Sequence, residues 1–269
     1  MKRLCFALLV CLLALKASAV AQSDLKKFFK EYAVEGSITI YDAKNDRWIF
    51  SDEADARRES LPASTFKIVN SLIALETGAV KSEKEIIRWD SVPRLVRGQP
   101  IKAWNADTDM ETAYKNSTVW FYVELAKRIG KEKYAEYLKR CNYGNGKIYG
   151  GEGADFWNYG EFGVSPAEQI EFLKKLQRSD LPFSTKTLET VSRIMIAETT
   201  NRYTLRGKTG WTSSNGNDIG WWVGYYETNG NTYFFATRIT KQLDVQNDRF
   251  GTCRKEITQK IFSELNLIP

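Results

Sequence analysis

Histidine is absent from all 269 residues of the chain. That absence excludes every catalytic scheme in which a histidine takes the proton of a serine or cysteine. It also removes the commonest zinc ligand, and no Cys-x-x-Cys pair stands in for it. A zinc site would need carboxylates alone, so we expect no metal and an activity that chelators leave unchanged.

Cysteine and long apolar runs are scarce as well. Beyond residue 21 only Cys141 and Cys253 remain, and whether they pair in an oxidising compartment is open. After the N-terminal segment no apolar run reaches the ~18 residues of a membrane helix, so we expect no membrane anchor. Acidic and basic residues are mixed along the chain, which disfavours nucleic acid as a partner. A monomer and a homodimer both remain open.

Residues 1–21 have the pattern of a secretory signal peptide. Two basic residues precede an apolar stretch at residues 4–15 and then small residues, with cleavage fitting after Ala19 or Ala21. Removing this segment takes away three basic residues and lowers the net charge from +6 to +3. We predict export to the periplasm and one catalytic domain over residues 22–269.

Strand patterns lie towards both ends of the chain, with helix patterns between them. The expected strands are residues 36–41, 47–50, 203–208, 220–227 and 232–239. The expected helical segments are residues 23–32, a helical middle over 60–176 that includes 118–129 and 131–140, and 249–265, with a long loop at 142–163. We predict an α/β (α+β) fold in which N- and C-terminal strands form one antiparallel sheet, flanked by helices and joined to a mostly helical subdomain.

Ser64 and Lys67 lie three residues apart in an apolar, helix-like run at residues 61–75. Helical positions i and i+3 share one face, so the hydroxyl and the amine can converge. A Ser-x-x-Lys pattern alone is weak, because Ser23 and Lys26 show it too. A buried lysine is costly as a cation, so Lys67 is either a structural residue with a partner or a neutral base for the serine.

Two further segments offer chemistry. Lys208, Thr209 and a following glycine are flanked by strand-like sequence, and Arg202 stands where a phosphate-binding loop needs glycine. The glycine would let another backbone approach closely; alternatively, the three residues lie on a sheet edge at a bulge. Ser117 either caps the helix at 118–129 or points into the same cleft.

In order and spacing these segments resemble the active-site serine β-lactamases and penicillin-binding proteins, whose motifs are Ser-x-x-Lys, Ser-x-Val or Ser-x-Asn, and Lys-Thr-Gly. Together with Tyr-Gly-Asn at 143–145 and Phe-Trp at 156–157, they are similar to a class D β-lactamase, or oxacillinase. Class A enzymes carry Ser-Asp-Asn as the middle motif, where this chain has Ser-Thr-Val at 117–119. The likeness covers nearly the whole chain after residue 21.

The resemblance implies that Ser64 opens a β-lactam ring and forms an acyl-enzyme. It further implies backbone amides of Ser64 and Trp211 as the oxyanion hole, Ser117 and Lys208 as a proton relay to the leaving nitrogen, and Thr209 and Arg254 as binders of the substrate carboxylate. Arg254 could instead be an ordinary surface residue. A D,D-peptidase and a β-lactam sensor that is acylated without turnover are the alternative functions.

In oxacillinases the lysine of Ser-x-x-Lys carries CO2 as a carbamate, which implies N6-carboxylysine at Lys67 and no other cofactor. Phe66, Val119 and Trp157 would desolvate this amine and so keep it neutral, as capture of CO2 requires. The resulting carbamate would serve as base in both half-reactions. One residue departs from the family, because Asn158 follows Trp157 where an apolar residue is usual.

Overall fold

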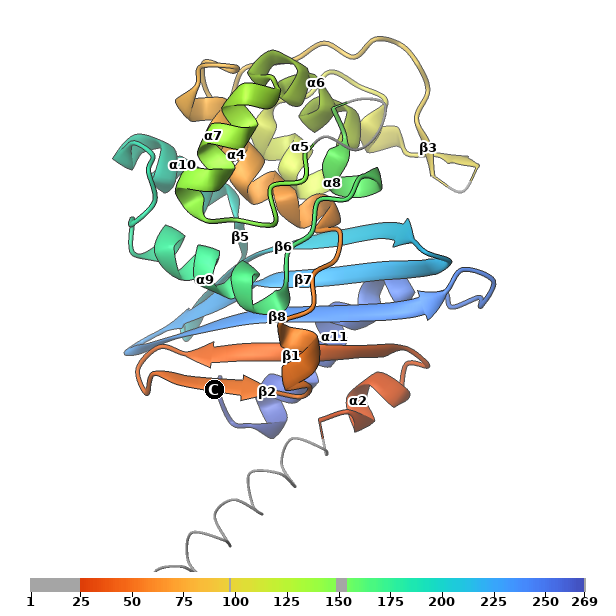
Figure 1. Cartoon of the computed structure of the whole chain (residues 1–269), viewed down its shortest axis with the longest axis vertical. Helices are drawn as coiled ribbons and strands as arrows, with labels where there is room; N and C mark the ends of the chain where they lie inside the picture. Colours follow the sequence, from red (N-terminus) through yellow and green to blue (C-terminus); the bar gives the residue numbers. More distant parts are fainter. Residues whose placement is uncertain (1–24, 97, 149–153, 269) are drawn as a thin grey trace, which may run out of the picture.

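The computed structural model describes residues 25–96, 98–148 and 154–268. The signal peptide predicted at 1–21 lies outside these residues. A six-stranded antiparallel sheet forms the centre, and a helical region is stacked on one of its faces (Figure 1). Within the described residues, no helix combines the length and the apolar character that crossing a membrane requires.

The sheet joins both ends of the chain, as the sequence predicts. Its order is β2-β1-β8-β7-β6-β5. The strands are β1 (Glu35–Asp42), β2 (Arg47–Phe50), β5 (Ile196–Thr199), β6 (Tyr203–Ser214), β7 (Asn217–Thr228) and β8 (Asn231–Gln242). β6 and β7 are longer than the expected strands because their polar ends also pair with each other. The two strands are joined by a turn in which Asn215 and Gly216 both have positive φ. The short, largely exposed β5 was not predicted.

The helical region is less continuous than the sequence predicts. Its elements are η1 (Ala63–Phe66), α4 (Lys67–Glu76), η2 (Lys102–Trp104), α5 (Met110–Asn116), α6 (Val119–Ile129), α7 (Lys131–Cys141), α8 (Phe156–Tyr159), α9 (Pro166–Gln177) and α10 (Thr185–Ile194). Residues 77–109 were expected to be helical. The described residues of this range form η2 and the strand pair β3 (Leu95–Val96) and β4 (Gln99–Pro100), because Gly78, Pro93 and Pro100 interrupt helix formation. α8 lies inside the expected loop at 142–163, and α10 was missed.

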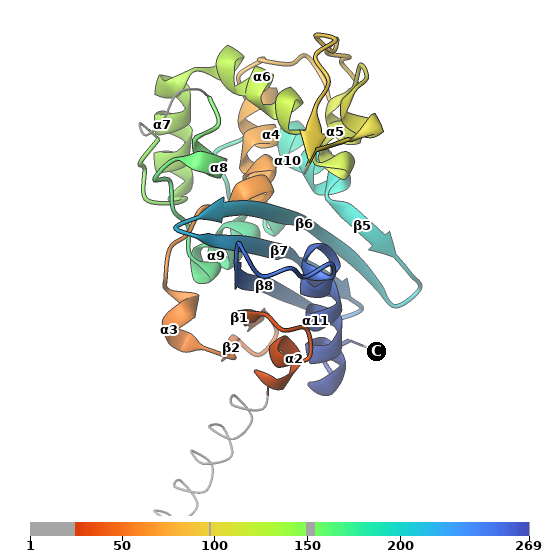
Figure 2. The same cartoon turned by 90° about the vertical axis from the view of Figure 1, so that its right-hand side faces the viewer.

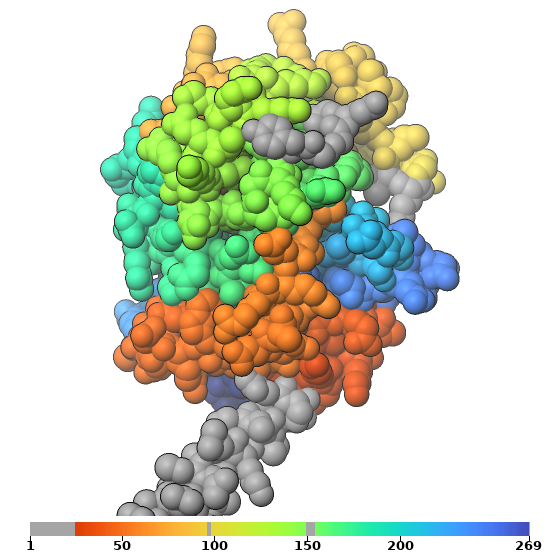
Figure 3. Space-filling model, in the orientation of Figure 1, coloured from red at the N-terminus to blue at the C-terminus, as the bar shows by residue number. Residues whose placement is uncertain are grey.

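Both faces of the sheet are covered by apolar side chains. Along β7, Trp221 and Val223 face the helical region, whereas Trp222 and Tyr226 face α11 (Phe250–Glu264) and α2 (Lys27–Lys30). Figure 2 shows α11 on the opposite side of the sheet from the helical region, and in the space-filling view the green and yellow helical residues lie above the orange N-terminal hairpin (Figure 3).

The remaining predictions concern the two terminal helices and the two cysteines. The helix expected at 23–32 is a single turn among the described residues, because Ala33 takes a left-handed φ and redirects the chain into β1. The helix expected at 249–265 is confirmed as α11. Cys141 and Cys253 are both buried and free, since they lie in the apolar clusters on opposite faces of the sheet.

Candidate active site

Ser64 and Lys67 meet as their spacing predicts. Ser64 lies in η1 and Lys67 begins α4, and the Lys67 Nζ donates a hydrogen bond of 2.9 Å to the Ser64 Oγ. Lys67 is fully buried, and this desolvation lowers the pKa of its amine to about 7. A large fraction of the amine is therefore neutral near pH 7, which is the state that can take a proton from the serine.

Aromatic rings enclose this pair. The Tyr122 ring lies 5.0 Å from the Lys67 Nζ. Phe66, the neighbour of Lys67 in the chain, stacks on Trp157 at 5.0 Å between ring centroids. Trp157 is fully buried, and its indole N–H finds no hydrogen-bond acceptor among the described residues. An unpaired buried donor costs about 1–3 kcal/mol, so this N–H is a position at which an added acceptor would be stabilised.

Ser117 joins the site through Lys208. The Lys208 Nζ donates to the Ser117 Oγ and to the Thr209 carbonyl, each at 3.0 Å. Burial lowers the pKa of Lys208 well below its usual range, and the nearby charge of Lys67 lowers it further. The alternative that Ser117 caps the following helix is wrong: Thr118 is the N-cap of α6, whereas Ser117 ends α5 with a left-handed φ of 57°.

The glycine of Lys-Thr-Gly allows the close approach that the sequence predicts. A Cβ on Gly210 would lie 2.8 Å from the Pro62 carbonyl oxygen in the turn that leads to Ser64. The bulge alternative is wrong, because β6 pairs with β7 in unbroken register through this stretch. The Gly207 amide donates to the carbonyl of Met195, the residue directly before β5. Amides alternate in direction along a strand, so the Trp211 amide points to the same side of β6, where η1 lies.

Arg254 is not the surface residue of the alternative interpretation. It is 7% exposed on α11, and burial lowers the pKa of its guanidinium to about 10, which leaves it charged at neutral pH. Its Nε has no hydrogen-bond partner among the described residues. With Thr209 it lines the cavity that contains Ser64. The pair can bind an anionic group there.

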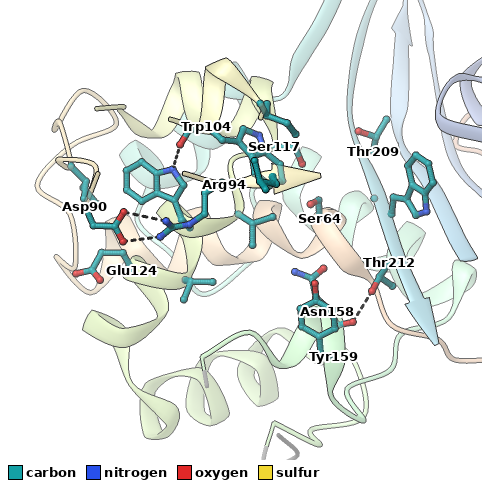
Figure 4. Close-up of a pocket in the computed structure, with 18 of the residues that line it drawn as sticks. Ser64, Asp90, Arg94, Trp104, Ser117, Glu124, Asn158, Tyr159, Thr209 and Thr212 are labelled. Atoms are coloured by element: carbon teal, nitrogen blue, oxygen red, sulfur yellow. Dashed lines mark hydrogen bonds and ion pairs between the residues drawn. The ribbon is translucent and has the colours of Figure 1, made fainter. Parts of the chain in front are cut away.

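Part of this set lines a cavity of about 960 Å³ (Figure 4). Of the predicted site residues, its lining includes Ser64, Ser117, Val119, Thr209, Trp211 and Arg254. Phe66, Lys67, Trp157 and Lys208 are not part of the lining. Two features of the cavity were not predicted from the sequence, because no motif marks them. One is the wall at which Arg94 pairs with Asp90, near Trp104 and Glu124. The other is the 2.6 Å hydrogen bond from the Thr212 hydroxyl to the Asn158 carbonyl.

The comparisons with known proteins agree with this geometry. The family model of the penicillin binding protein transpeptidase domain matches residues 36–263. β-Lactamase OXA-2 of Salmonella typhimurium is 38% identical over 98% of this chain and 94% of its own. The structure of a class D β-lactamase from Sebaldella termitidis is 45% identical, covers 91% of this chain and 97% of its own, and superposes with a TM-score of 0.86. The structure of the class D β-lactamase YbXI from Nostoc is 43% identical, covers 90% of this chain and 98% of its own, and superposes with a TM-score of 0.82.

The match of the transpeptidase model and the shared fold place the chain among the penicillin-binding transpeptidase-like proteins. Within that class, its identity to OXA-2 and to the two solved structures is near full length, so the chain belongs to the class D β-lactamases, a family of serine hydrolases.

Proposed function

We propose that the chain hydrolyses the amide of penicillins and related β-lactams through an acyl-enzyme on Ser64. The observation that carries this proposal is the 2.9 Å contact between Ser64 and Lys67 in a chain without histidine, where burial holds the pKa of the amine at about 7. Family membership supplies the substrate class. Export to the periplasm belongs to the same proposal, and sequencing the mature N-terminus should find Val20 or Gln22.

Acylation follows from the positions of these side chains. The Ser64 Oγ passes its proton to the base at Lys67 and attacks the β-lactam carbonyl. Amides of Ser64 and Trp211 stabilise the oxyanion. The C–N bond then breaks, and the leaving nitrogen takes a proton from Ser117, which is replaced from Lys208 across their 3.0 Å contact. Thr209 and Arg254 hold the substrate carboxylate.

The residues around Lys67 fit a carbamate formed from CO2. The lowered pKa of Lys67 supplies the neutral amine that reacts with CO2. The indole N–H of Trp157 has no hydrogen-bond acceptor among the described residues, and an oxygen of the carbamate could accept from it. When bound, the group would supply an oxyanion base at neutral pH, so that a glutamate base of the class A type is not needed.

Mass spectrometry tests the acyl-enzyme. Lys67→Ala incubated with a penicillin should gain the full mass of the antibiotic, and peptide mapping should place the adduct on Ser64. An adduct on Ser23 or Ser117, or hydrolysis that survives Ser64→Ala, would overturn the proposal.

Turnover separates the proposed hydrolase from its two alternatives. Steady hydrolysis of a chromogenic cephalosporin by the parent enzyme is expected. A stoichiometric burst that stalls would instead indicate a D,D-peptidase or a sensor.

A further inference from the structure

Asn158 is a polar side chain built into the wall of the cavity beside Ser64. It is 5% exposed, and the family resemblance leads us to expect an apolar residue at this position. Its Nδ2 donates to the Asp155 Oδ1 at 2.7 Å, and its backbone carbonyl accepts from the Thr212 hydroxyl at 2.6 Å. α8 is thus tied to β6 at the edge of the cavity, and Figure 4 shows the Asn158 amide pointing towards Ser64.

The orientation of the Asn158 amide follows from its partner. An ionised carboxylate only accepts hydrogen bonds, so the NH2 group must face Asp155 and the Oδ1 must face away from it. Burial raises the pKa of Asp155 to about 6, and the hydrogen bond from Asn158 opposes that rise, so the carboxylate form prevails at neutral pH. The side chain is therefore held with its oxygen directed away from Asp155.

That oxygen is an unused acceptor. Among the residues that the structure describes, none donates a hydrogen bond to the Asn158 Oδ1. Because Asn158 lines the cavity, this acceptor is open to solvent and can hold a water there by a hydrogen bond. Lys67 does not line the cavity, whereas Ser64, Val119 and Asn158 do. A water held by Asn158 therefore lies on the cavity side of Ser64, the side on which an acyl group would sit.

We propose that Asn158, oriented by Asp155, binds the water that hydrolyses the Ser64 acyl-enzyme, an inference that rests on the proposed function. The water donates one O–H to the Asn158 Oδ1 and attacks the ester carbonyl with its lone pair. Its other proton passes to the base at Lys67. The bond between the acyl carbon and the Ser64 Oγ then breaks, Ser64 regains that proton, and the product leaves as an acid. Asn158 contacts the reacting water; Asp155 is a positioning residue.

The test separates deacylation from acylation. Asn158→Leu keeps the approximate size of the side chain and restores the apolar wall of the family. Stopped-flow acylation should change less than threefold, whereas decay of the acyl-enzyme, followed by intact mass, should slow by about 10- to 100-fold. In the steady state kcat and KM should fall together, leaving kcat/KM nearly unchanged. If Asn158→Leu does not fold, Asn158→Ala carries the same expectation.

Asp155 provides a second readout that a merely structural role would not produce. Asp155→Ala should slow deacylation about three- to tenfold in the parent. In Asn158→Leu, where the amide is gone, it should have a clearly smaller effect, because only the charge interaction of Asp155 with Lys67 then remains. Asp52→Ala is the matched control: Asp52 accepts the Asp55 amide at 3.0 Å far from the cavity, so its loss should leave deacylation unchanged.

All rates are measured in saturating bicarbonate, so that an effect on the base at Lys67 is not mistaken for one on the water. Unchanged deacylation in Asn158→Leu would overturn the inference, as would a defect that is present at low bicarbonate and disappears on adding more. Hydrolysis that survives Ser64→Ala would instead overturn the proposed function, so the two failures are distinguishable.

Discussion

The buried amine of Lys67 imposes a stability cost that its chemistry requires. Its pKa falls from 10.5 to about 7 because burial disfavours the charged form. Between these two values the unfolded chain holds the proton and the folded chain does not, so stability rises with pH across this window. Below about pH 7 the full cost to folding stability is present. The fall in pKa from 10.5 to about 7 corresponds to roughly 4–5 kcal/mol.

We therefore expect Lys67→Met to stabilise the fold while it abolishes hydrolysis. In CO2-free buffer at pH 7 the gain in free energy of unfolding should be about 1–4 kcal/mol, the lower value allowing for the lost contact with Ser64. Near pH 10.5 the gain should largely vanish. Urea unfolding at both pH values measures it, and an equal gain at both would show that burial of the amine is not the cause.

The proposed carbamate on Lys67 leads to a separate prediction for Trp157. Activity should fall in degassed, bicarbonate-free buffer and recover when bicarbonate is added. Trp157→Phe keeps a ring against Phe66 but removes the unpaired indole N–H, so it should need more bicarbonate for the same activity. With ¹³C-bicarbonate the parent should give a carbamate resonance that Lys67→Met lacks. An enzyme indifferent to bicarbonate and without that resonance would use Lys67 as a free amine.

At the scale of elements, the contact between β6 and η1 sets the distance between the Trp211 amide, proposed for the oxyanion hole, and Ser64, the proposed nucleophile. Gly210→Ala would place a Cβ 2.8 Å from the Pro62 carbonyl and push the strand away from the turn. We expect acylation to slow by about 10- to 100-fold and stability to fall by about 1–3 kcal/mol. Stopped-flow acylation and urea unfolding measure the two effects.

Gly251→Ala is the control for Gly210→Ala. Its Cβ would meet the Trp211 ring at 3.4 Å, an ordinary contact, within a helix that favours alanine. It should acylate as the parent does. Equal rates in Gly210→Ala and the parent would mean that the close approach of β6 is not needed for catalysis.

Elements with a strong local signal could be predicted from the sequence, and those set by contacts between distant segments could not. The helices expected at 118–129 and 131–140 have such a local signal, and the structure confirms them as α6 and α7. β5 has four residues and little burial, so no pattern marks it. The left-handed conformation of Ser117 depends on how α5 meets α6, which spacing along the chain does not encode.

The candidate site shows the same division. Ser64 and Lys67 are three residues apart in a helix, so their contact follows from the sequence. The contact of Lys208 with Ser117 joins residues 91 positions apart, and only the family resemblance predicted it. The hydrogen bond between Asn158 and Asp155 is local, but the sequence does not reveal that a cavity lies beside it.

At the scale of the whole molecule, one sheet connects two apolar clusters, and only one of them carries the site. The cluster that contains Phe66, Tyr122 and Trp157 surrounds Lys67. The cluster across the sheet contains Phe29 of α2 and Ile257 of α11. The segment directly after the predicted signal peptide therefore contributes to stability without reaching the cavity.

Phe29→Ala tests whether residues 22–269 unfold as one domain. Phe29 is 2% exposed, and α2 is tied to the C-terminal part of the chain by the hydrogen bond from Asn247 to the Tyr32 carbonyl at 2.8 Å. Losing a buried phenylalanine should cost about 3–5 kcal/mol and lower the melting temperature by roughly 10 °C. Circular dichroism and tryptophan fluorescence should report one shared transition, and kcat/KM of the folded enzyme should not change.

The exposed neighbour Lys30 provides the control, since Lys30→Ala should alter stability by no more than about 0.5 kcal/mol. If α2 merely frays, Phe29→Ala should lose a little helical signal and leave the main transition where it was. Two separate transitions would show that the clusters on the two faces unfold independently. Coincident transitions are expected because β1, β7 and β8 place side chains in both clusters, so neither cluster can open without exposing part of the other.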